Sequence, residues 1–147
     1  MSLINTINSI TSLDLDAMVA RPTVGSQSTH GGYCGSAVKP IALNMVAEIA
    51  RDAPTRSLPI SGIGGVSNWR DAAEFMALGA GSVQVCTAAM LHGFRIVEEM
   101  KDGLSRWMAE KGYGSIAAFS GKAVANTTDW KHLDMNFKSV AHIDQDK

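Results

Sequence analysis

The segment LPISGIGGVSNWRDAAEFMALGAGSVQVCTAAM, residues 58–90, determines the fold class of this chain. Its pattern predicts a short strand at Leu58–Ser61, a helix at Trp69–Leu78 that is closed by Gly79, and a second strand at Ser82–Cys86. A strand, a crossover helix and a further strand in this order indicate parallel strands within one sheet.

The flanking sequence continues the same alternation. Leu3–Ile10 is apolar and β-branched enough for a strand, and the helical spacing that begins at Pro40 runs to about Arg51. A longer helix is expected over Phe94–Glu110. The polar, glycine-containing stretch Thr11–Tyr33 reads as a long loop, and so long a loop in a compact domain usually has a function.

Three predicted parallel strands fit two architectures, an open doubly wound sheet or part of a (β/α)8 barrel. A complete barrel takes about 250 residues, whereas this chain has 147. We therefore expect an α/β piece of a larger domain.

Composition restricts the possible partners. A hydrophobic fraction of 46%, a charged fraction of 18% and a net charge of −1 fit a packed domain and do not favour nucleic acid. The chain contains no apolar run that approaches the roughly 20 residues of a membrane span. Cys34 and Cys86 are too few for a disulfide framework or a cysteine-only metal site. We expect a cytoplasmic protein with reduced thiols, no membrane association and no bound metal.

Residues 61–66, SGIGGV, contain three glycines between a predicted strand and a predicted helix. Bare backbone N–H groups at a helix start can hold a phosphate, and glycine allows its oxygens to approach. Residues 84–90, QVCTAAM, end the next strand with a turn of small residues, so the two loops together predict a phosphate cradle. In the alternative interpretation, Gly64 and Gly65 only satisfy turn geometry. The spacing matches neither a Walker motif nor the dinucleotide fingerprint.

Three stretches of the chain resemble one known family. They are INTINSI (residues 4–10), HGGYCGSAVKPIALNMVAEIA (residues 30–50) and the segment 58–90. In order and spacing they are similar to the dihydropyrimidine dehydrogenases, in particular to the flavin-bearing subunit of the bacterial NAD-dependent enzyme. These enzymes group with the FMN-containing dihydroorotate dehydrogenase barrels. The resemblance covers about Ile4 to Phe137.

The resemblance implies a place within a (β/α)8 TIM barrel. Residues 1–137 are expected to form a partial FMN-binding TIM-barrel domain, its C-terminal portion with about strands six to eight, their helices and an irregular tail. Residues 138–147 are expected to be a linker toward a ferredoxin-like segment. On this view the sequence is cut at both ends, because strands one to five and the ferredoxin segment lie outside it.

The resemblance also implies two sets of site residues. One set matches three backbone contacts with the phosphate side of FMN and consists of Gly35, Ile63, Gly64, Gly65, Cys86 and Thr87. The other, Asn5 and Thr6, matches an Asn-Thr pair that hydrogen-bonds the pyrimidine. A side-chain amide both donates and accepts, which suits the alternating groups of a pyrimidine edge. The alternative for Asn5 and Thr6 is a cap at a strand end.

In the family that the chain resembles, a reduced flavin passes a hydride to C6 of uracil or thymine, and a cysteine supplies the proton at C5. Electrons reach FMN through iron–sulfur clusters from a partner subunit that oxidises NADH or NADPH. The proton-donating cysteine and the clusters are expected outside this chain. The resemblance therefore implies that the chain holds no catalytic residue of its own and is inactive alone. We also expect it to self-associate as a homo-oligomer.

Two alternative functions remain open. Dihydroorotate dehydrogenase shares the phosphate cradle, although no residue that would bind the orotate carboxylate is identifiable. A non-catalytic half-barrel module that binds phosphate ligands is the other alternative.

Overall fold

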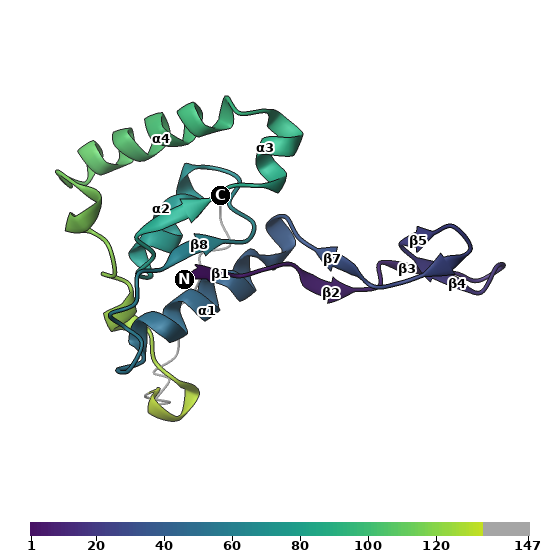
Figure 1. Ribbon diagram of the computed structural model, residues 1–147. Helices are drawn as coiled ribbons and strands as arrows, with labels where there is room; N and C mark the ends of the chain where they lie inside the picture. The colour runs from purple at the N-terminus through teal and green to yellow at the C-terminus, as the bar shows by residue number, and fades with distance from the viewer. Residues whose placement is uncertain (134–147) are drawn as a thin grey trace, which may run out of the picture.

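A computed structural model describes residues 1–133 of the chain. Its centre is a three-stranded parallel sheet in the order β1 (Ser2–Leu3), β8 (Ser61–Ile63) and β9 (Ser82–Gln84) (Figure 1). The mixed α/β architecture with a parallel sheet agrees with the predicted fold class. The predicted linker, residues 138–147, lies outside the described residues.

The described part of the chain also contains four α-helices and four 3-10 turns. They are η1 (Ser36–Val38), α1 (Lys39–Arg51), α2 (Trp69–Ala77), α3 (Thr87–His92), α4 (Ile96–Glu110), η2 (Ile116–Ala118), η3 (Val124–Asn126) and η4 (Trp130–His132). Helix α1 packs on β1 and β8, α2 packs on β9, and α4 covers α2 (Figure 1). None of the helices within residues 1–133 combines the length and apolar character needed to cross a bilayer.

The prediction of one continuous strand over Leu3–Ile10 is wrong. After β1 the chain leaves the parallel sheet, and β2 (Ile7–Ser9) pairs in antiparallel fashion with β7 (Gly31–Tyr33). The side chain of Asn5 accepts a hydrogen bond from the N–H of Thr6 at 2.7 Å. Such local side-chain bonding competes with a strand ladder, and it occurs at the point where the two strands separate.

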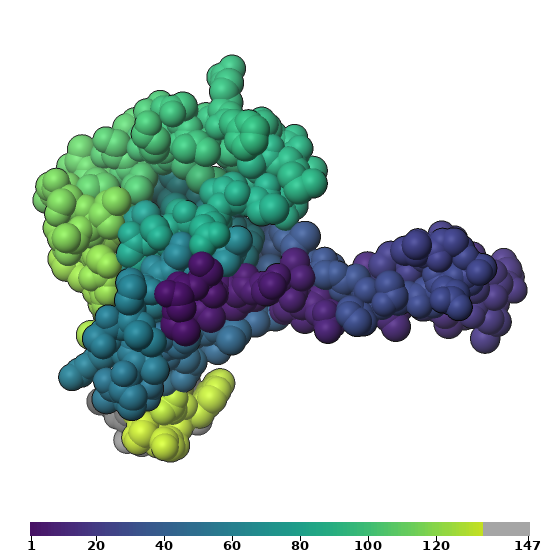
Figure 2. All heavy atoms as spheres, viewed as in Figure 1, coloured from purple at the N-terminus to yellow at the C-terminus, as the bar shows by residue number. Residues whose placement is uncertain are grey.

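The stretch Thr11–Tyr33 is not a loop but most of a β-ribbon. Within it β3 (Ser12–Asp14) pairs with β4 (Val19–Arg21), and β5 (Thr23–Val24) pairs with β6 (Gln27–Ser28). Together with β2 and β7, these strands form an arm that projects from the body (Figures 1 and 2). We call residues 7–33 the β-arm.

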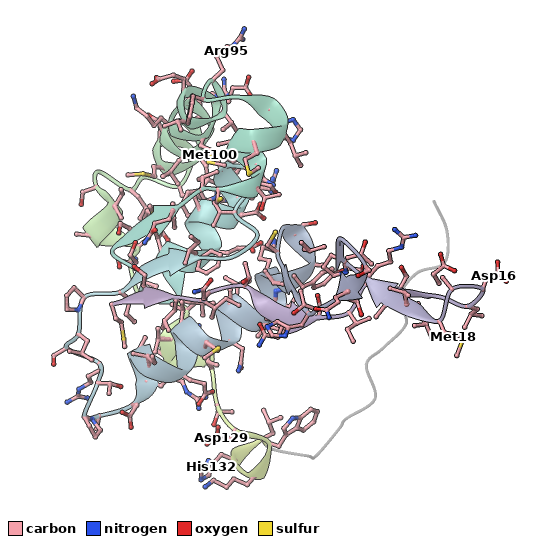
Figure 3. All side chains as sticks on the ribbon, turned by 45° about the vertical axis from the view of Figure 1, so that its right-hand side comes forward. Asp16, Met18, Arg95, Met100, Asp129 and His132 are labelled. Carbon is pink, nitrogen blue, oxygen red and sulfur yellow. The ribbon has the colours of Figure 1, made fainter. Side chains whose placement is uncertain are left out.

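The composition of the β-arm explains why it reads as a loop. The arm stands clear of the body, and its tip carries Asp16 and Met18 (Figure 3). Strands that are not packed on a core need no alternation of apolar and polar residues, so the period-2 signal is lost. Glycines and prolines in the sequence then dominate the pattern.

The strand predicted at Leu58–Ser61 lies further along the chain, at Ser61–Ile63. The first glycine of the SGIGGV segment is therefore part of the strand. A Cβ at Gly62 would lie 2.5 Å from Cδ1 of the buried Phe75 ring. Gly62 is required because α2 packs directly on this strand.

The predicted helix boundaries agree closely with the structure. Helix α2 begins with a capping box in which the side chains of Asn68 and Asp71 accept hydrogen bonds from each other's backbone N–H groups. It is followed by Gly79 at a φ of 104°, which confirms the predicted terminating glycine. Helix α4 begins at Ile96, slightly later than the predicted Phe94.

The core lies between the sheet and its helices. Ala42 and Val46 of α1 and Phe75 of α2 are 0% exposed. From α4, Met100 points into this core, whereas Arg95 points away from it (Figure 3).

The segment after α4 is irregular, as predicted, but it belongs to the core. Phe119 is only 2% exposed, and its ring lies 5.1 Å from the Trp107 ring in an edge-on contact. The N–H of Gly121 donates to the carbonyl of Met76 at 3.0 Å, which joins this segment to α2. The N–H of Ala123 donates to the next carbonyl of α2 at 2.9 Å.

Gly103→Ala is expected to destabilise the protein, although alanine normally stabilises a helix by about 1 kcal/mol relative to glycine. Gly103 lies within α4, and a Cβ there would come within 2.5 Å of Cγ of Trp69. Overpacking of this kind costs about 1–3 kcal/mol. Urea denaturation of the variant and of Ser105→Ala, an exposed position in the same helix, measures the effect. A higher unfolding midpoint for Gly103→Ala would contradict the close packing of α4 on Trp69.

Candidate functional site

A cavity of about 740 Å³ opens where the three parallel strands end. Its walls come from the residues that follow β1, β8 and β9, together with η1 and α3. Its volume lies in the range of small-molecule sites. The carboxyl ends of parallel strands are also where such folds bind ligands.

All eight residues that the sequence singled out line this cavity. They are Asn5, Thr6, Gly35, Ile63, Gly64, Gly65, Cys86 and Thr87. The structure therefore brings together side chains and backbone from three loops that are far apart in sequence.

The loops around the cavity approach one another closely at two points. The hydroxyl of Thr87 donates a hydrogen bond to Sγ of Cys34 at 3.5 Å. A Cβ on Gly65 would lie 2.8 Å from the carbonyl oxygen of Gly35. The wall before η1, the turn after β8 and the start of α3 thus converge on one region.

The glycines of the turn after β8 are required by the protein's own packing. A Cβ at Gly64 would lie 2.9 Å from Cβ of Ala42, and one at Gly65 would lie 2.8 Å from Cβ of Lys39. Their φ angles of 126° and 76° also disfavour other residues. Turn geometry, as in the alternative interpretation, and close packing are therefore enough to explain why these positions are glycine. Neither reason requires a bound ligand.

The backbone around the cavity is nevertheless suited to an anion. Within residues 1–133, the N–H groups of Gly35, Gly65 and Cys86 donate to no protein acceptor. Thr87 is the first residue of α3, where backbone N–H groups lack an intrahelical partner. Among the described residues no lysine or arginine lines the cavity. A phosphate there would be held by backbone N–H groups, so the residues present fit the phosphate end of a flavin nucleotide.

Asn5 and Thr6 are exposed at the cavity, next to the end of β1. The Asn5 side-chain oxygen is engaged by the neighbouring N–H, which is the strand-end cap of the alternative interpretation. Within residues 1–133 the Asn5 Nδ2 has no partner, so it is a donor available to a ligand.

The sequence interpretation missed several polar residues of the cavity, among them Ser36, Ser67 and Gln84. The Gln84 side-chain nitrogen donates to the hydroxyls of Ser2 at 2.9 Å and Ser61 at 3.0 Å. Ser82 and Gln84 are two residues apart in β9 and so lie on one face of the sheet. This spacing indicates a polar face of the strand, but it does not show that the face borders the cavity.

Asp71 lies behind the turn that follows β8, and it is only 4% exposed. Its carboxylate accepts a hydrogen bond from Nζ of Lys39 at 2.6 Å and from the hydroxyl of Ser67 at 2.7 Å. Burial acts to raise the pKa of Asp71, but the bonds from Lys39 and Ser67 outweigh it and hold the pKa below its ordinary value. Asp71, followed by Glu74, raises the pKa of Lys39.

The depressed pKa of Asp71 predicts a loss of stability in acid. A carboxyl with a lowered folded-state pKa contributes stability that is present above its unfolded pKa, near 3.8, and is lost as pH falls through the folded-state value. We expect the free energy of unfolding, measured by urea titration, to fall below about pH 4. Asp71→Asn should flatten this dependence, while Glu74→Gln, at an exposed position, should largely retain it. An unchanged pH profile in Asp71→Asn would contradict the assignment.

Comparisons with known proteins found one matching family model and several similar curated proteins. The family model described as dihydroorotate dehydrogenase matches residues 1–108. The NAD-dependent dihydropyrimidine dehydrogenase subunit PreA of Escherichia coli K12 is 42% identical over 147 residues, which are 100% of this chain and 36% of that protein. The chloroplastic dihydropyrimidine dehydrogenase (NADP(+)) of Arabidopsis thaliana is 36% identical over 150 residues, with 100% of this chain and 35% of that protein covered.

A second kind of relative is also similar. The catalytic subunit of dihydroorotate dehydrogenase B (NAD(+)) from Pyrococcus abyssi is 37% identical over 121 residues, which are 82% of this chain and 39% of that protein. The chain thus spans little more than a third of the length of the curated relatives it matches.

Proposed function

The chain belongs to the dihydroorotate dehydrogenase family, whose relatives here are oxidoreductases, and from this premise we propose that it is part of an FMN-dependent dihydropyrimidine dehydrogenase. The reaction proposed is the reduction of uracil or thymine to the 5,6-dihydropyrimidine with electrons from NADH or NADPH. The observation that carries the proposal is the 42% identity to a dihydropyrimidine dehydrogenase subunit along 100% of this chain.

We assign the FMN phosphate to the backbone around the cavity. Its holders are the N–H groups of Gly35, Gly65 and Cys86 and the start of α3 at Thr87. These residues line the cavity, and the first three N–H groups donate to no protein acceptor within residues 1–133. Ile63 and Gly64 complete the backbone of this wall. When bound, FMN would supply hydride transfer, while the protein supplies position and electrostatics.

The pyrimidine is assigned to the part of the cavity lined by Asn5 and Thr6. Nδ2 of Asn5 would donate to a ring carbonyl. On the family resemblance, the proton donor, the iron–sulfur clusters and the NAD(P)H-oxidising partner subunit are placed outside this chain. We also place β1, β8 and β9 as the sixth to eighth barrel strands, which accords with their parallel neighbouring order. The two free cysteines accord with a cytoplasmic protein.

Dihydroorotate dehydrogenase is the second candidate, because the catalytic subunit of that name from Pyrococcus abyssi is 37% identical over 82% of this chain. The dihydropyrimidine dehydrogenase relative is 42% identical over 100% of this chain. Its higher identity and wider coverage favour the pyrimidine substrate.

Flavin titration of the purified 147-residue chain tests the cofactor assignment. We expect FMN to bind, with a change in flavin fluorescence, and riboflavin, which lacks the phosphate, to bind much more weakly. Equal affinities for the two flavins would overturn the phosphate cradle. No binding of either would overturn the proposed function of this chain.

The chain alone is expected to show no dye-linked uracil reduction, since we assign no proton donor to it. Light scattering should show a homo-oligomer, because β1 and β9 are unpaired edges of the described sheet and such edges promote association. A monomer that reduces uracil at an enzyme-like rate would contradict both statements.

A further inference from the structure

The turn between β8 and α2 contributes four residues to the cavity wall, Gly64, Gly65, Val66 and Ser67. We propose that Asp71 is the positioning residue for this turn, and that through Lys39 it fixes the turn against the opposite wall at η1. The inference rests on the proposed function, since the group to be positioned is the anion-binding backbone. Asp71 itself does not line the cavity.

The contacts of Asp71 exceed those of a helix cap. Its Oδ2 accepts from the N–H of Ser67 at 2.8 Å, the hydroxyl of Ser67 at 2.7 Å, the N–H of Asn68 at 3.2 Å and the Asn68 side-chain amide at 2.9 Å. A capping box alone requires only the bond from the Asn68 N–H. The additional bonds orient Ser67, which is the last cavity residue of the turn.

The other carboxylate oxygen connects two walls of the cavity. Oδ1 accepts from Nζ of Lys39 at 2.6 Å, and Lys39 begins α1 directly after η1. The two walls touch at Gly65, where a Cβ would lie 2.8 Å from the carbonyl oxygen of Gly35 and from Cβ of Lys39. The backbone of Gly65 and of Gly35 is therefore held at a fixed separation by one carboxylate and one ammonium group.

The carboxylate is essential to this arrangement because Asp71 is the acceptor in all five hydrogen bonds. Among residues 1–133, Asp71 is the one charged residue that is buried. In Asp71→Asn, Nδ2 would face either Lys39 or the donors of Ser67 and Asn68, so neither orientation of the amide preserves the set. Buried donors that lose their acceptor are costly, and the turn is expected to shift.

Amide hydrogen exchange and ligand titration of the full chain test the inference. In Asp71→Asn the N–H groups of Ser67 and Asn68 should exchange much faster than in the wild type, and the dissociation constant for FMN should rise about tenfold or more. Lys39→Gln provides a second variant, which keeps the capping box and removes the connection to α1. It should weaken FMN binding while the Ser67 N–H remains protected.

Two control variants separate positioning from general destabilisation. Met100→Ala removes a buried side chain of α4 that does not line the cavity, and it should leave the FMN dissociation constant near that of the wild type. Glu74→Gln changes an exposed partner of Lys39 that makes none of the bonds to the turn. It should also bind FMN normally.

The outcomes distinguish this inference from the proposed function. Unchanged exchange at Ser67 and Asn68 in Asp71→Asn overturns the positioning role, whether or not FMN binds. Equal weakening of FMN binding in Met100→Ala and Asp71→Asn overturns it as well, because stability alone would then explain the loss. If the wild-type protein binds no FMN but the exchange result is as expected, the positioning role of Asp71 is upheld and the assignment of FMN to the cavity is wrong.

Discussion

Gly65→Ala is expected to abolish useful FMN binding, with a rise in the dissociation constant of about 100-fold or more, as the loss of two charge-assisted hydrogen bonds would give. The new Cβ would lie 2.8 Å from the carbonyl oxygen of Gly35 and 3.1 Å from the backbone nitrogen of Lys39. Both neighbours are backbone atoms, so no side chain can rotate away. One of the two walls must move, and the N–H groups that face the anion move with it.

Gly25→Ala is the matched control for this substitution. Gly25 has a φ of 61°, close to the 76° of Gly65, but nothing lies within 4 Å of its Cβ position in the β-arm. It should therefore show only the cost of a left-handed alanine, about 1–2 kcal/mol, and bind FMN normally. Flavin titration with urea denaturation of both variants separates backbone strain from steric displacement. Normal FMN affinity in Gly65→Ala would contradict the cradle.

Phe75→Ala is expected to lower the free energy of unfolding by about 3–5 kcal/mol, the usual cost of removing a buried aromatic ring. Phe75 is 0% exposed and belongs to the buried core cluster, with its ring against Gly62 of β8. A loss of this size is a large fraction of the stability of an ordinary domain. Chemical denaturation measures it directly, and Ile41→Ala, at a position that is 47% exposed on α1, is the control.

A double-mutant cycle with Gly62 tests the cause of this effect. Alone, Gly62→Ala should destabilise the protein, since its Cβ would lie 2.5 Å from the Phe75 ring. With Phe75→Ala the same methyl enters space that the ring has left, so the two losses should not add. Strict additivity would show that the ring and the strand do not share this contact.

Local patterns in the sequence were enough to predict the elements that are built locally. Proline near the start of α1 and Gly79 after α2 mark helix ends through their own backbone preferences. The three strands of the parallel sheet were identified, with boundaries that shifted by a few residues in β8. The two-residue strand β1 was extended too far, because Ile7–Ser9 has the composition of a strand but pairs with a different partner.

The eight residues that the sequence singled out all line the cavity, but the sequence did not reveal the physical reason for its glycines. Residue types and spacing indicated a phosphate cradle, and the family resemblance assigned the positions. The atoms that exclude a side chain at Gly64 and Gly65 belong to Ala42, Gly35 and Lys39, which lie more than twenty residues earlier in the chain. A local sequence pattern cannot predict such a contact.

The sequence by itself therefore determined the fold class, most helix boundaries and the loops that meet at the cavity. Only the tertiary structure decided which helical apolar residues are buried: Val46 is 0% exposed, whereas Ile41 on the same helix is 47% exposed. It also decided that Thr11–Tyr33 is a β-ribbon and that Asp71 joins Ser67 to Lys39. The physical reason is that helix ends and turns depend on neighbouring backbone dihedrals. Burial, strand pairing and a buried ion pair depend on groups that only folding brings together.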